Sequence, residues 1–174
     1  MAIEYPWYEI VEGDVLEQGD VLLACPIIVP IVGYPLEGNT QGDVQIYDVI
    51  IMTQSCDLEN EKVQDIIVCP HWDLRTAGET DSVLAKKSTW QSIIKGHQYR
   101  YAMLSAWRNE EFSIDVRIVD FGRIFSLPRD FVRQLATERG KRLRLCPPYR
   151  EHLSQSFARF FMRVGLPQDI ELPE

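Results

Sequence analysis

The chain has 174 residues, 45% of them apolar and 25% charged, which is an ordinary globular composition and enough sequence for one domain. Its net charge is −8, no apolar run approaches the roughly 18 residues of a membrane span, and the N-terminal MAIEYPWYEIVEGD does not resemble a signal peptide. We therefore expect neither a membrane protein nor a secreted disulfide scaffold, and the four cysteines favour free thiols in a cytoplasmic protein.

The charge is distributed unevenly along the chain. Residues 1–81 contain sixteen acidic and two basic residues, whereas residues 82–174 contain ten acidic and sixteen basic residues. Either the two halves attract each other within one fold, or a basic face is available to RNA or to an acidic protein partner. Composition alone does not distinguish these alternatives.

In the first half, short runs rich in β-branched residues predict strands at residues 7–11, 21–32, 44–53 and 64–69. A loop rich in Gly and Pro separates the second run from the third, and Pro70 is expected to end the fourth.

In the second half, helical spacing predicts a helix over residues 82–95, and three further strands are expected at 99–107, 112–120 and 122–126. A helix over 129–138 and an edge strand over 141–146 follow. The last helix, from Pro148 to Val164, has the clearest apolar face: Tyr149, Leu153, Phe157, Phe160, Phe161 and Val164.

These elements predict one α+β domain over residues 1–174. Its strands occupy about residues 7–126, with the helical insert at 82–95, and its helical C-terminal part occupies about residues 129–165. Because helices do not separate the strands regularly, we expect a small, strongly bent antiparallel sheet or barrel.

The segment VIIMTQSCDL, residues 49–58, passes directly from a buried strand into polar residues. Cys56 ends one predicted strand, and Cys69 and His71 end the next, so the three side chains meet if the strands are neighbours. They would then suit zinc or a nucleophilic thiol activated by His71, although simple packing of the cysteines is the more usual outcome. Asp57 either joins such a site or caps the following turn.

Basic side chains form a second candidate surface. His152, Ser156, Arg159 and Arg163 recur at spacings of 4, 3 and 4 on the last helix. Together with Arg142 and Arg144 they predict a surface for RNA phosphates, while the alternative is the solvated rim of an amphipathic helix.

The order of QGDVLL, VIIMTQSCDL, DIIVCP and RIVDFGRIFSLP resembles the PemK/MazF-like toxins. That resemblance implies an SH3-like barrel and a homodimeric endoribonuclease. The loop at residues 33–43 lacks the arginine of the toxins, and Cys69-Pro70-His71 stands where their catalytic Thr or Ser lies. In this chain His71 would act as general acid or base, and Arg75 would stabilise developing phosphorane charge.

Three hypotheses follow. The first is a toxin- or phage-defence-type protein that binds or cleaves RNA, with catalytic candidates His71, Arg75, Cys56 and Asp57 and no metal or cofactor. The second is a non-catalytic interaction module with acidic and basic faces. The third is a Cys/His site for zinc or thiol chemistry.

Overall fold

The computed structural model describes residues 5–31, 33 and 42–162, and it confirms the α+β class. Arg163, Val164 and most of the Gly/Pro-rich loop lie outside the described residues. The strands are β1 (Tyr8–Val11), β2 (Val21–Pro30), β3 (Gly42–Ile51), β4 (Asp65–Asp73), β5 (Tyr101–Leu104), β6 (Trp107–Arg108), β7 (Ser113–Ile114), β8 (Arg117–Asp120), β9 (Phe125–Pro128) and β10 (Arg142–Leu145). The helices are α1 (Ser55–Glu59), α2 (Leu74–Thr80), α3 (Lys87–Ile94), α4 (Arg129–Arg139) and α5 (Tyr149–Phe161).

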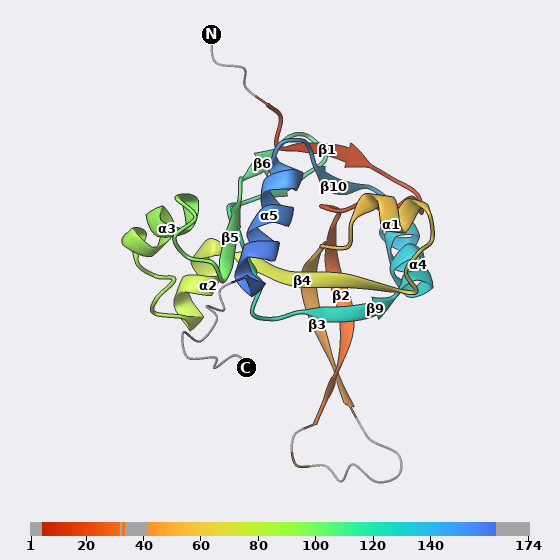
Figure 1. The fold of residues 1–174 in the computed structure, drawn as a ribbon, viewed down its shortest axis with the longest axis horizontal. Coiled ribbons are helices and arrows are strands. Elements are labelled where there is room, and N and C mark those ends of the chain that lie inside the picture. The colour runs from red at the N-terminus through yellow and green to blue at the C-terminus, as the bar shows by residue number, and fades with distance from the viewer. Residues whose placement is uncertain (1–4, 32, 34–41, 163–174) are drawn as a thin grey trace, which may run out of the picture.

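The central feature is a six-stranded antiparallel sheet in the order β2-β3-β4-β8-β5, in which β9 also pairs with β4 (Figure 1). Strands β1 and β10 form a separate pair, and so do β6 and β7. In the part of the chain that the structure describes, β2 and β5 end the path of paired strands and do not pair with each other, while β9 has β4 as its one strand partner. The bent antiparallel sheet is therefore present, whereas its closure into a barrel is not observed.

Strand β4 corrects the prediction that Pro70 ends it, because the strand continues to Asp73. On one side of β4, residues 65–68 pair with β9 and residues 71–73 pair with β8. Pro70 lies between these two pairings, so its missing N–H costs no ladder hydrogen bond. This changeover lets one strand hold two neighbours and brings His71 into the sheet.

The sheet is covered on both faces. On one face, a cluster that includes Ile50, Cys69 and Phe121 packs against β1, β10 and α5. On the other face, Val49 and Val68 belong to a cluster that also contains Val132 and Leu135 of α4, so this cluster fills the space between the sheet and α4. The predicted apolar face of the last helix is largely confirmed, since Leu153 is buried and Phe157 packs on Phe121.

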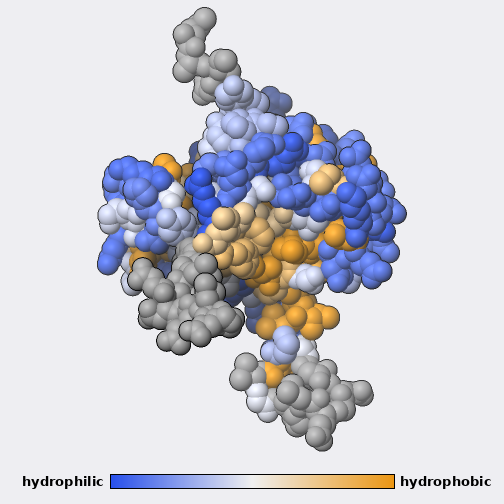
Figure 2. Space-filling model, viewed as in Figure 1, coloured by the Kyte–Doolittle hydropathy of each residue, from blue (hydrophilic) through white to orange (hydrophobic). Residues whose placement is uncertain are grey.

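The hairpin of β2 and β3 extends away from the body of the molecule (Figure 1). An apolar patch lies at the base of this hairpin (Figure 2). Farther along the hairpin, Ile28, Val44 and Ile46 are exposed apolar residues. No helix within residues 5–31, 33 and 42–162 combines the length and the apolarity that crossing a membrane requires.

Candidate functional site

His71 belongs to a buried polar cluster that also contains Asp48 and Arg117. Strand register places Asp48 of β3 directly opposite His71 of β4, and Arg117 comes from β8 on the other side of β4. The Nε of Arg117 donates a hydrogen bond of 3.0 Å to His71 Nδ1, and its guanidinium also donates to Asp48. The backbone N–H of Ala24, which lies in the β2 bulge, donates to the other Asp48 oxygen at 2.9 Å.

This cluster keeps His71 neutral. Only 1% of the residue is exposed, and its Nε2 has no hydrogen-bond partner among the described residues. Burial, and then the charge of Arg117, hold the pKa of His71 well below its usual range. A general base needs access to a substrate proton, so the predicted catalytic role of His71 does not fit its position.

Arg75 is exposed in the first turn of α2, where its backbone N–H donates to Asp73. The cation that contacts His71 is Arg117, which the sequence did not place beside His71. Alternation within RIVDF correctly predicted a strand, but which face Arg117 would occupy depended on knowing its neighbour β4.

Cys56 and His71 lie toward opposite ends of β4. The backbone N–H of Met52 donates to the carbonyl of Ile67, near the start of β4, and Cys56 lies four residues after Met52, in α1. His71 lies near the end of β4. The thiol of Cys56 is exposed, and the carboxylate of Asp57 pairs with Lys62 at 3.8 Å. The prediction that Cys56 and His71 lie close together is therefore wrong.

Cys69 is buried in the core, and that burial raises the pKa of its thiol to about 12. Among the described residues, no group of three or more His, Cys, Asp or Glu side chains is arranged to hold a metal ion. The structure therefore does not assemble the Cys56, Cys69 and His71 ligand set of the zinc hypothesis.

The polar residues after β3 secure backbone segments. The hydroxyl of Thr53 accepts from the Ile67 N–H at 2.8 Å, and the hydroxyl of Ser55 accepts from the Gln18 N–H at 3.1 Å. These side chains thus have structural roles, but the predicted capping of the following turn is wrong: they join distant segments, and α1 has no side-chain cap.

The prediction that Arg142 and Arg144 belong to an RNA-binding surface is wrong, because both guanidinium groups are buried around Asp20. Arg142 Nε donates to Asp20 at 2.9 Å and also bonds to two backbone carbonyls. Arg144 pairs with Asp20 and with Glu17, at 2.7 Å in the latter case. The attraction between the acidic and basic halves of the chain is thus used inside the fold, and neither arginine faces a polyanion.

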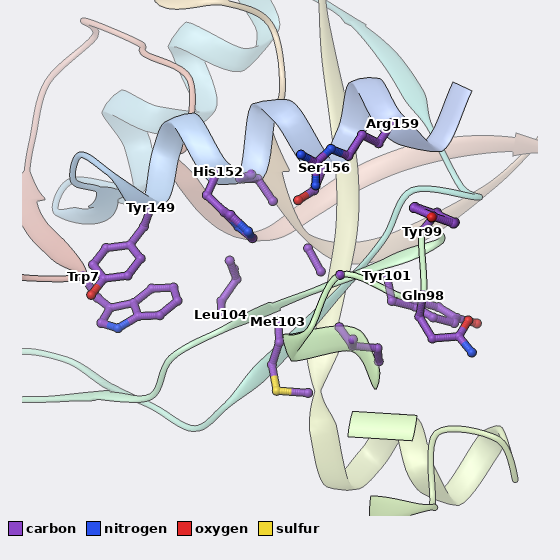
Figure 3. Close-up of a pocket in the computed structure, with 14 residues that line it drawn as sticks. Trp7, Gln98, Tyr99, Tyr101, Met103, Leu104, Tyr149, His152, Ser156 and Arg159 are labelled. Carbon is purple, nitrogen blue, oxygen red and sulfur yellow. The ribbon is translucent and has the colours of Figure 1, made fainter. Parts of the chain in front are cut away.

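A groove lies between β5, the end of α3 and α5, and we call it the aromatic groove (Figure 3). Its lining includes Trp7, Tyr99, Tyr101, Met103, Tyr149 and His152. The rings of Trp7 and Tyr149 stack with centroids 3.7 Å apart and an interplanar angle of 10°. In Figure 3 these two rings lie at one end of the groove, with Tyr99 and Gln98 at the other.

The predicted helical stripe contributes to this groove. His152, Ser156 and Arg159 all line it, and Figure 3 shows them along the face of α5 that borders the groove. Arg163 lies outside the described residues. Trp7 and Tyr149 are 142 positions apart, so no local pattern could reveal their stacking; only the pairing of β1 with β10 brings them together.

No family model matches the chain, and no curated protein matches it either.

Proposed function

We propose that this chain is a protein-interaction module that binds a partner in the aromatic groove. The observation that carries the proposal is the nature of the groove lining, which is aromatic and apolar with His152 and Arg159 on the α5 side. Aromatic residues and arginine are enriched at protein interfaces, where large apolar side chains supply much of the binding energy.

Two features weigh against hydrolysis of RNA at the predicted residues. His71 is buried and neutral, and its cationic partner is engaged by Asp48. Cys56 and Asp57 lie near the opposite end of β4. The aromatic groove is thus the better candidate for function. A kinship of the sheet with SH3-like toxin barrels remains part of the proposal, supported by the antiparallel β2-β3-β4 order and the bulge in β2.

Binding of single-stranded RNA is the second candidate, because the groove offers aromatic rings at both ends, with His152 and Arg159 along its α5 side (Figure 3). Against it, Arg142 and Arg144, which were expected to contact phosphates, form buried ion pairs with Asp20. With so few unpaired cations at the groove, the balance favours a protein partner.

A matched pair of isoleucines tests the site. Ile94 lines the groove and is 67% exposed, whereas Ile46 is 60% exposed on the β2–β3 hairpin. Peptides of about ten residues, long enough to span the groove at roughly 3.3 Å per residue, are selected from a random library against the wild-type chain.

We expect Ile94→Glu to weaken these peptides at least about tenfold, because a charge enters an apolar contact, and Ile46→Glu to leave them unchanged. Fluorescence anisotropy measures both affinities. A peptide set that tolerates Ile94→Glu but is lost with Ile46→Glu would move the binding surface to the hairpin, and an empty selection would contradict a peptide-binding groove.

A further inference from the structure

Strand β5 presents an unpaired backbone edge to the aromatic groove. Four consecutive residues of β5, Tyr101 to Leu104, line the same hollow. Side chains of successive strand residues point to opposite faces, so a single face cannot supply all four. The groove must therefore be bordered by the edge of the strand.

Hydrogen-bond register identifies the backbone groups at this edge. Phe121 N–H donates to Arg100 C=O at 2.8 Å, which makes Arg100 and Phe121 a hydrogen-bonded pair. In an antiparallel ladder such pairs alternate, so Ala102 and Leu104 bond to β8 while the N–H and C=O of Tyr101 and Met103 point away from it. No hydrogen bond between described residues is found for these outward groups.

The opposite edge of the sheet has a different design. The register of β3 with β4, followed through the β2 bulge, directs the backbone of Pro26, Ile28 and Pro30 outward from β2. Proline has no N–H, so two of these three outward positions lack a donor, which is a common protection of an exposed edge. None of the four β5 residues is a proline, so β5 lacks this form of protection.

The two walls of the groove define the side chains that a bound strand would need. Ala102 and Leu104 belong to the core on the α5 side, whereas Tyr101 and Met103 pack with the core that contains α3 residues. An added strand would therefore alternate its side chains between Trp7, Tyr149 and His152 on one wall and Ile93 and Ile94 on the other.

Charge narrows the class of partner. Acidic residues outnumber basic residues in this chain by 26 to 18, yet none of the described residues that line the groove is acidic. Arg159 and His152 border it instead. An apolar segment with an acidic residue toward the Arg159 end would complement this lining.

We propose that the partner is an extended protein segment, apolar with a flanking acidic residue, that adds to the sheet as a strand beside β5 and bonds to the backbone of Tyr101 and Met103. This inference rests on the proposed function, since it concerns the same groove. Strand addition to an exposed edge is an established mode of peptide recognition, in which the backbone supplies affinity and alternate side chains supply specificity.

Amide hydrogen exchange on the wild-type chain tests the proposal with the library-selected peptides described above. Strand addition would slow exchange at the Met103 or Tyr101 amide at least about tenfold, because these N–H groups gain acceptors. A peptide whose binding is weakened by Ile94→Glu, but which leaves the exchange rates of both amides unchanged, would overturn strand addition while the proposed function stands. Peptides insensitive to Ile94→Glu would overturn both.

A backbone variant gives a second readout. Met103→Pro removes an outward N–H without touching a bond to β8, whereas Met103→Leu keeps that N–H and a similar side chain. We expect Met103→Pro to weaken the peptide at least about tenfold and Met103→Leu to change it little. If Met103→Pro folds and binds as tightly as Met103→Leu, the strand-addition proposal is wrong; if it does not fold, the exchange experiment decides.

Discussion

The ionic cluster around Asp20 and the aromatic groove use side chains in opposite ways. Around Asp20, two arginines that sequence alone would place at the surface are buried and paired. At the groove, rings that sequence alone would assign to the core line a hollow open to solvent. The contrast shows that Arg142 and Arg144 hold the fold together, and it leaves aromatic surface as the feature that the proposed partner would use.

The largest expected effect comes from the ionic cluster. Asp20→Asn removes the one buried carboxylate that both guanidinium groups share and leaves Arg144 with the partly exposed Glu17, and breaking a buried pair in this way costs about 3–5 kcal/mol. Urea unfolding followed by circular dichroism measures the loss.

Glu17→Gln is the control for that loss. Glu17 pairs with Arg144 and Arg150, but about a third of its side chain is exposed (33%), so its removal should cost within about 1 kcal/mol. Equal and small losses for the two variants would mean that Asp20 does not anchor the fold.

The buried cluster of His71 predicts a dependence of stability on pH. The folded pKa of His71 is lowered by burial and by Arg117, with Asp48 as the opposing charge, so the unfolded chain takes up a proton that the folded chain does not. Stability should therefore fall as the pH drops below about 6.5, by at most about 1.4 kcal/mol per pH unit from this residue.

His71→Gln should flatten this part of the stability curve, while His152→Gln, at an exposed position, should not. The midpoint of urea unfolding is measured for each variant at a series of pH values from neutral to mildly acidic, and the slopes of stability against pH are compared. An unchanged slope in His71→Gln would mean that His71 titrates freely in the folded protein.

Local patterns predicted the elements that depend on local physics. Short runs rich in β-branched residues located most strands, helical spacing located α5, and the helix expected over residues 129–138 corresponds to α4. The end of β4 was predicted too early, at Pro70, because a proline normally ends a strand. In the fold its missing N–H is harmless because the partner of β4 changes there from β9 to β8.

The candidate site was harder to predict because its members are distant in sequence. The alternation in KRLRLC predicted an edge strand, and β10 does have β1 as its strand partner. The burial of all four β10 residues was not predicted, because it depends on Asp20 compensating the charge of the two arginines. His152 and Arg159 were found from helical spacing, but the edge of β5 and the rings of Trp7 and Tyr149 needed the tertiary fold.

One competition measurement tests most directly whether the aromatic groove serves a protein and not RNA. A selected peptide and a labelled single-stranded RNA of about ten nucleotides are titrated against the chain at low salt, where phosphate contacts are strongest. We predict that the peptide binds and the RNA does not. RNA binding that weakens steeply with salt and is displaced by the peptide would contradict the assignment and make the groove a nucleic-acid site.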